Sequence, residues 1–115
     1  LELAGGRPVV QYRDGILPLV DLREFFNHDA VLSDEELQHV VVFNYGSRQV
    51  GFIVQKILDI VQERLVVSSE ERRTGTRGAA VIQKLVTEVL DPADIVKRSR
   101  PEFEMLSGGN PEAVN

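Results

Sequence analysis

Residue types that commonly carry chemistry are sparse in this chain. There is no cysteine, which excludes a disulfide framework, a thiolate zinc site and a thiol nucleophile. The two histidines, His28 and His39, stand outside any His-Glu-x-x-His pattern, so loop or strand-end roles are favoured over metal binding. The sequence therefore predicts no metal site and no cofactor.

The hydroxyl and carboxylate groups also lack a catalytic arrangement. Asp14, Asp21 and Glu24 could together supply a carboxylate pair for acid–base catalysis, but turn and cap roles explain these three residues. Glycoside chemistry would also favour a sugar-stacking tryptophan, which the chain lacks. The segment 75–78 is interpreted as a turn, because no helix follows it to hold a phosphate. The serines weighed as nucleophiles sit on no strand-to-helix elbow: Ser47, Ser68, Ser69 and Ser107. We expect a protein that is not an enzyme.

Composition limits the classes of partner. The formal net charge is −5, and the 13 basic residues are scattered apart from clusters at 72–77 and 97–100, which we interpret as solvated loop charge. A nucleic-acid partner is therefore not expected, because polyanion binding needs concentrated positive charge. No apolar run approaches the roughly 20 residues of a membrane span, and no signal-peptide pattern is present. We predict a cytoplasmic protein without membrane insertion.

Two hairpins and several further strands indicate an all-β fold. Asp14-Gly15 separates the β-rich runs 9–13 and 16–20, and the turn 45–48 separates 39–44 from 49–54. Pro18 cannot donate to a ladder, so its strand should have a free edge or a bulge there. The segment 52–61 fits either a helical face or a strand, and we assign it as a strand. Further strands are predicted over 65–67, 78–82 and 85–90.

Two helical turns are predicted, near 22–26 and 92–97. Asp21 and Asp91 each follow a strand and precede an acid three residues on, and Pro92 suits the first helical position. This internal echo predicts two similar half-domains. The segment 27–38 is expected to be a loop with a helical turn begun by Ser33. We assign 1–98 to one domain and 99–115 to a tail, in which Phe103, Met105 and Leu106 contact the body.

Over about residues 7 to 96 the chain resembles the CheW-like domain. The resemblance is carried by the runs 12–26 and 39–54, with 78–82 and 89–91 like the family's closing strands. Family domains begin earlier and place Arg and Gly side by side, whereas Asp14 intervenes here. The resemblance implies an N-terminally truncated pair of small SH3-like barrels, the first incomplete. The sequence of residues 16–19 is more similar to the domain of the chemotaxis kinase CheA than to the adaptor CheW.

The resemblance implies a non-catalytic role in chemotaxis signal transduction, a two-component system. Partners would be the cytoplasmic tips of chemoreceptors and the CheA and CheW domains, with homodimer formation or strand exchange through an exposed edge. Arg13 matches a position implicated in coupling, and signature positions supply the other expected partner-binding residues: Pro18, Asp21, Leu22, Val50 and Gly51. The alternative is a small-ligand-binding or regulatory β-barrel of an unrelated enzyme, which a deep polar pocket would favour.

Overall fold

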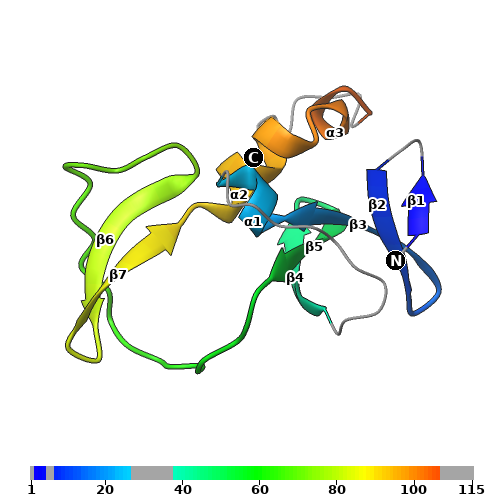
Figure 1. The fold of residues 1–115 in the computed structure, drawn as a ribbon. Helices are drawn as coiled ribbons and strands as arrows, with labels where there is room; N and C mark the ends of the chain where they lie inside the picture. Colours follow the sequence, from blue (N-terminus) through cyan, green and yellow to red (C-terminus); the bar gives the residue numbers. More distant parts are fainter. Residues whose placement is uncertain (1, 5–6, 27–37, 107–115) are drawn as a thin grey trace.

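Two open sheets form the fold in the computed structural model, which describes residues 2–4, 7–26 and 38–106 (Figure 1). The larger sheet has the order β1-β2-β3-β5-β4, in which only the β3–β5 pair is parallel. Its strands are β1 (Glu2–Ala4), β2 (Arg7–Tyr12), β3 (Gly15–Asp21), β4 (His39–Tyr45) and β5 (Arg48–Val54). The all-β prediction is confirmed, although the described residues form no closed barrel.

A second, two-stranded sheet and three short helices complete the described chain. Strands β6 (Thr76–Ile82) and β7 (Leu85–Leu90) form an antiparallel hairpin that extends to one side of the larger sheet (Figure 1). The helices are α1 (Leu22–Phe25), α2 (Pro92–Ser99) and α3 (Glu102–Leu106). The two predicted helical turns are therefore present, at α1 and α2.

Both long hairpins of the larger sheet turn through two residues. In the first, Tyr12 pairs with Gly15, so the turn residues are Arg13 and Asp14, one position earlier than predicted. Arg13 takes a φ of +54° and Asp14 does not adopt a positive φ. One positive φ at the first turn position matches the twist of the strands, so Gly15 can begin β3. The predicted turn at 45–48 is confirmed, with Gly46 at a φ of +63°.

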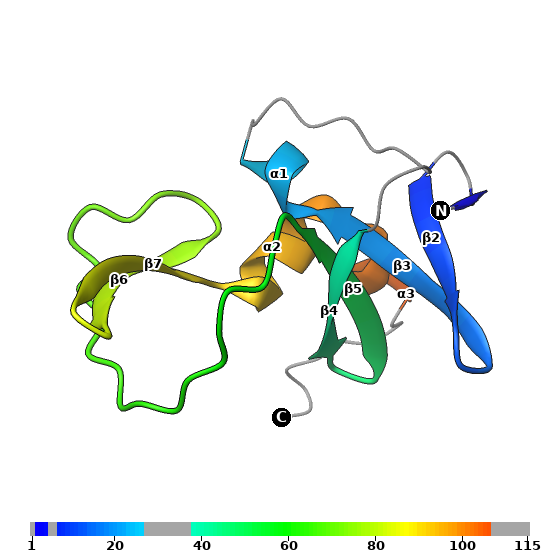
Figure 2. The same ribbon diagram turned by 60° about the horizontal axis from the view of Figure 1, so that its bottom comes forward.

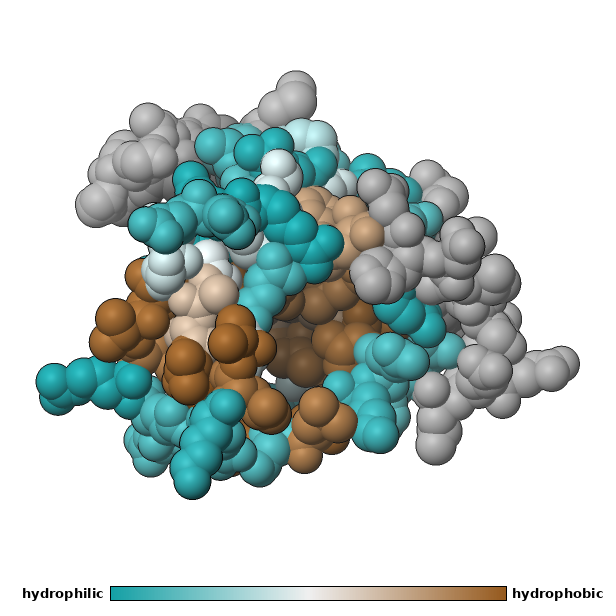
Figure 3. Space-filling model, turned by 60° about the vertical axis from the view of Figure 1, so that its left-hand side comes forward, coloured by the Kyte–Doolittle hydropathy of each residue, from teal (hydrophilic) through white to brown (hydrophobic). Residues whose placement is uncertain are grey.

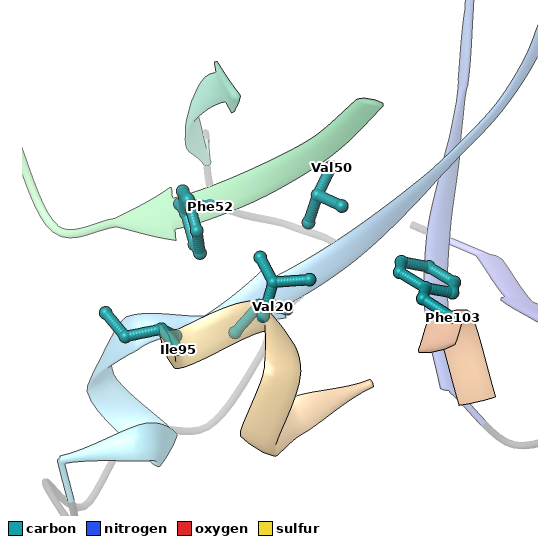
Figure 4. Packing of buried hydrophobic residues seen from close by; sticks show 6 residues of the cluster. Val20, Val50, Phe52, Ile95 and Phe103 are labelled. Atoms are coloured by element: carbon teal, nitrogen blue, oxygen red, sulfur yellow. The ribbon is translucent and has the colours of Figure 1, made fainter. Parts of the chain in front are cut away.

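The apolar core lies on both faces of β5. On one face Val50 and Phe52 pack with Val20 of β3 and with side chains from the helices, namely Ile95, Val96 and Phe103 (Figure 4). On the other face Ile53 packs with Leu17 and Leu19. Residues 50–53 are consequently all buried, so the alternation expected for this strand does not produce a solvent face. A strand covered on both sides is the centre of the fold.

The predicted echo between the two aspartates is present in the structure. The Asp21 carboxylate accepts a hydrogen bond from the backbone N–H of Arg23 at 2.9 Å, and Asp91 accepts one from Asp94 at 3.1 Å. Pro92 stands in the first helical turn of α2. Each aspartate satisfies a backbone donor that its short helix would otherwise leave unpaired. The same strand–cap–helix unit thus occurs twice.

The strand predictions for 52–61 and 65–67 are wrong. Strand β5 ends at Val54, and 55–67 is irregular, with a single bridge between Ser68 and Ala79 just beyond it. No described strand lies beside 55–67 to supply a ladder, and β-branched composition does not make a strand without a partner. The prediction for Pro18 is confirmed at that position: Pro18 pairs with Val9 of β2, whereas the β3–β5 ladder begins only at Leu19, so β3 has a free side at Pro18 although it is an inner strand of the sheet.

The interpretation of the basic cluster at 97–100 as solvated loop charge is wrong for one of its arginines. Lys97 and Arg98 are exposed on α2, but Arg100 is buried. Its guanidinium donates to the backbone carbonyls of Pro8 and Leu19, each at 3.1 Å. Burial lowers the pKa of Arg100 from its ordinary value. This side chain anchors the α2–α3 connection on strands β2 and β3.

Residues beyond the predicted domain boundary contribute to this core. Phe103 of α3 is 5% exposed and lies under the guanidinium of Arg48, 4.9 Å from the ring centre. The division into 1–98 and 99–115 stays a prediction. His28 and the Ser33 turn lie outside the described residues, as do the side chains of Met105 and Leu106.

Replacing the α3 anchor should destabilise the whole fold. Phe103→Ala is expected to lower the free energy of unfolding by about 3–5 kcal/mol, because it removes a buried aromatic ring from the main cluster. Urea titration followed by circular dichroism measures the change. The control Val86→Ala removes an exposed side chain and should cost less than about 0.5 kcal/mol. Equal stability of the two variants would contradict the placement of Phe103.

Candidate partner-binding surface

Arg13 lies at the exposed tip of the β2–β3 hairpin. Its guanidinium sits 5.1 Å from the centre of the Tyr12 ring, a cation–π contact that directs the charge over an aromatic face. Beside it, Ile16, Ser47 and Gln49 line an open depression of about 380 Å³. The tip thus offers a charge, an aromatic ring and an apolar side chain together, which is the composition of a small contact site.

The other predicted site residues lie deeper in the fold. Val50 is fully buried, and a Cβ at Gly51 would come within 2.6 Å of Val40, so both serve the packing of β5. Asp21 is buried as the α1 cap and forms an ion pair with Arg23 at 3.1 Å. Pro18 and Leu22 are half-buried. The structure does not group these five residues with Arg13, and their predicted role in partner binding would act through the shape of the sheet.

A large apolar surface lies elsewhere, on the segment 55–67 and the β6–β7 hairpin. Figure 3 shows apolar residues gathered around a hollow on this side of the molecule. Ile60 is 89% exposed and Val66 83%. We call the following set the exposed apolar surface: Ile57, Leu58, Ile60, Val66, Val81, Leu85 and Val86. Scattered single apolar residues need no explanation, whereas a concentration of exposed apolar side chains on two segments is typical of interaction surfaces.

Sequence reasoning missed this surface because it placed these residues in strands. Segment 55–67 has the composition of a buried strand, with Ile57, Ile60 and Val66 among polar residues. That composition predicts burial, and the structure leaves the residues exposed. The mismatch between an apolar segment and a solvated position was the available signal, but it is visible only once the strand partners are known.

Arg73 connects the hairpin to the rest of the fold. Its guanidinium donates to both carboxylate oxygens of Glu88 on β7, at 2.8 and 2.6 Å. The same group lies 4.2 Å from the centre of the Phe26 ring, at the end of α1. Nearby, the Asp91 N–H donates to the Gly75 carbonyl at 2.9 Å. These contacts orient the hairpin, and with it the exposed apolar surface, relative to α1.

The described polar pockets do not resemble a ligand site. One of about 330 Å³ is lined by Arg72, Arg73 and Arg98, but Arg73 is paired with Glu88 and Arg98 with Asp94. It is open to solvent, and so is a pocket of about 270 Å³ beside Arg100. Within residues 2–4, 7–26 and 38–106, no three acidic or histidine side chains are grouped as metal ligands. A deep polar pocket, which would favour the small-ligand alternative, is not among the described pockets.

None of the helices in the described ranges is both long and apolar enough to cross a bilayer.

Comparison with known protein families identifies the domain. The sequence profile of the CheW-like domain matches residues 2–100. A search of curated proteins found no significant match. The profile covers both sheets and helix α2, so it includes the Arg13 hairpin and the exposed apolar surface.

Stability should depend on the Arg73–Glu88 pair only above acidic pH. The hydrogen bond from Arg73 lowers the pKa of Glu88 from its ordinary value of 4.5. A carboxyl whose pKa is lower in the folded state adds stability above 4.5, and this is lost as the pH falls through the folded value. Both side chains are substantially exposed, so Glu88→Gln should cost no more than about 1 kcal/mol at neutral pH.

Urea unfolding of both proteins at about pH 7 and about pH 3 checks this pair, because Glu titrates between those values. The difference between wild type and Glu88→Gln should shrink at the lower pH. The exposed Glu71→Gln in the same loop is the control and should change stability little at neutral pH. A Glu88→Gln difference that persists unchanged at the acidic pH would contradict the ionic origin of the contact.

Proposed function

Because the chain belongs to the CheW-like domain family, we propose that it couples chemoreceptors to the histidine kinase CheA through protein–protein contacts. CheW-like domains are non-catalytic adaptor modules of chemotaxis signalling. The proposed partners are the cytoplasmic tips of chemoreceptors and the domains of CheA and CheW. The protein would then act in the cytoplasm, at receptor arrays. The sequence of residues 16–19 favours a CheA kinase over the adaptor CheW as the protein to which this domain belongs.

The exposed apolar surface is the observation that supports this proposal. Each of its side chains would contribute roughly 1.5–3 kcal/mol if a partner fully buried it. Because Leu58, Ile60, Val66 and Val86 are each more than four-fifths exposed, most of that free energy remains to be gained. Association also costs several kcal/mol of lost freedom, so a few anchors on this surface would carry the affinity.

Arg13 provides a second, charged contact in this proposal. The hairpin tip is exposed, and the Arg13 guanidinium lies over the ring of the neighbouring Tyr12. A charge at the rim of an interface sets specificity and the rate of encounter more than total affinity. Arg13 would therefore adjust coupling, whereas the exposed apolar surface would supply most of the binding energy.

Removing the Arg13 guanidinium should weaken partner binding without loss of stability. Arg13→Ala is expected to reduce affinity for a chemoreceptor cytoplasmic fragment by about three- to tenfold, which corresponds to roughly 1 kcal/mol. Isothermal titration calorimetry measures the affinity, and the free energy of unfolding should stay within about 0.5 kcal/mol of wild type. Lys97→Ala, which removes another exposed positive charge, on α2, is the control. Unchanged affinity of Arg13→Ala would refute the proposed role.

A charge placed on the exposed apolar surface should have a larger effect. Leu58→Glu is expected to weaken binding of the receptor fragment, or of CheW, by more than about tenfold, because a carboxylate would be buried without a partner. Ala93→Glu is the control, since Ala93 is exposed on α2 and belongs neither to this surface nor to the Arg13 tip. If both partners bind Leu58→Glu as tightly as wild type, the surface is not the coupling site.

A further inference from the structure

Strand β4 ends the larger sheet, and its outer side is not paired with any described strand. The strand order is β1-β2-β3-β5-β4, and Figure 2 shows β4 at the border of the sheet beside β5. The opposite border is β1, which has only three residues, whereas β4 has seven. A long border strand offers a row of backbone donors and acceptors to another strand.

The side chains of β4 lack the usual protection against such pairing. Soluble proteins place lysine, proline or a bulge on border strands to keep other chains away. The segment His39–Tyr45 contains no Lys, Arg, Asp, Glu, Pro or Gly, although 27% of the whole chain is charged. Its ladder with β5 runs without a break over all seven residues, so no bulge interrupts it. The border is unbroken by a bulge, uncharged and rich in β-branched residues.

Both faces of β4 continue the core toward this border. Phe43 packs with the cluster that contains Val50 and Phe52, and Val40 and Val42 pack with the cluster of the other face. Val41, which alternates onto the Phe43 face, remains 43% exposed. One more strand beside β4 would therefore extend two existing apolar layers rather than create new ones.

We propose that β4 pairs antiparallel with β4 of a second copy of this chain. A symmetric antiparallel pair must be centred on a residue, because only then do outward-facing backbone groups meet each other. Centring on Val42 uses the whole strand and sets Val41 opposite Phe43 of the second copy. A β-branched side chain beside an aromatic ring is a favourable cross-strand pair.

Charge favours an identical chain as the occupant of this border. Each chain carries −5 overall, yet no acidic side chain lies on β4, so two copies meet there without opposed like charges. A strongly charged peptide would find no complementary charge on the strand. A pair of seven-residue strands should bury less than the roughly 800 Å² per partner of a stable complex, so we expect weak association, with a dissociation constant on the order of 100 µM.

Sedimentation equilibrium of the full chain tests the pairing, with protein concentrations on both sides of the expected dissociation constant. Wild type should shift reversibly from monomer toward dimer. Val41→Lys should raise the dissociation constant at least about tenfold, because two lysines would lie diagonally across the symmetry axis at about 7–8 Å. The control Val86→Lys makes the same substitution on the exposed apolar surface and should dimerise like wild type. Circular dichroism verifies that each variant is folded.

A charge exchange makes the test specific to the proposed register. Val41→Glu alone should also be monomeric, whereas an equimolar mixture with Val41→Lys should restore the dimer, because opposite charges then meet across the axis. The pairing is overturned if wild type stays monomeric, if Val41→Lys dimerises normally, or if the mixture fails to recover. Loss of the dimer in Val86→Lys would place self-association on the other surface. These self-association measurements use no receptor fragment, so their result is independent of the proposed receptor coupling.

Discussion

The fold depends on the burial of strand β5 between two apolar layers. Val50 and Phe52 face the helices while Ile53 faces Leu17 and Leu19, so one strand joins both clusters. Gly51 makes this approach feasible, because a Cβ there would come within 3 Å of three neighbouring side chains. Helices α2 and α3 reach the same strand through Ile95 and Phe103. The chain segments before and after the β6–β7 hairpin are thereby held to one strand.

This constraint also explains how the hairpin can be exposed and yet oriented. The hairpin adds little to the clusters around β5, and its position relative to α1 relies on Arg73, with Glu88 on one side and the Phe26 ring on the other. Surface ion pairs contribute little to stability, but they can restrict orientation. Held in this orientation, the hairpin presents its exposed apolar side chains to solvent, where a partner could contact them. The Arg13 hairpin, which joins the inner strands β2 and β3, adds a separate contact.

The sequence predicted the local elements well and their exposure poorly. Turn residues and caps act through neighbouring backbone, so both hairpins, the Asp21 and Asp91 caps and the β6–β7 strands were found, with the first turn shifted by one residue. Burial depends on distant partners. The pattern of residues 55–67 therefore predicted strands that are absent, and Arg100 looked like a surface charge although it binds the carbonyls of Pro8 and Leu19. Of the predicted site residues, Arg13 is at an exposed tip, whereas Val50 and Gly51 are placed in the packed core of β5.

Amide hydrogen exchange of the chain, alone and with a chemoreceptor cytoplasmic fragment, tests the account most directly. In the free protein the amides of Val50–Ile53 should exchange most slowly, because they lie in a doubly covered strand. Binding should slow exchange in the segment 57–66 and in the β6–β7 hairpin, with a smaller effect at the Arg13 tip. Slowing confined to other segments, or none at a saturating concentration of the fragment, would contradict the assignment of the exposed apolar surface as the coupling site.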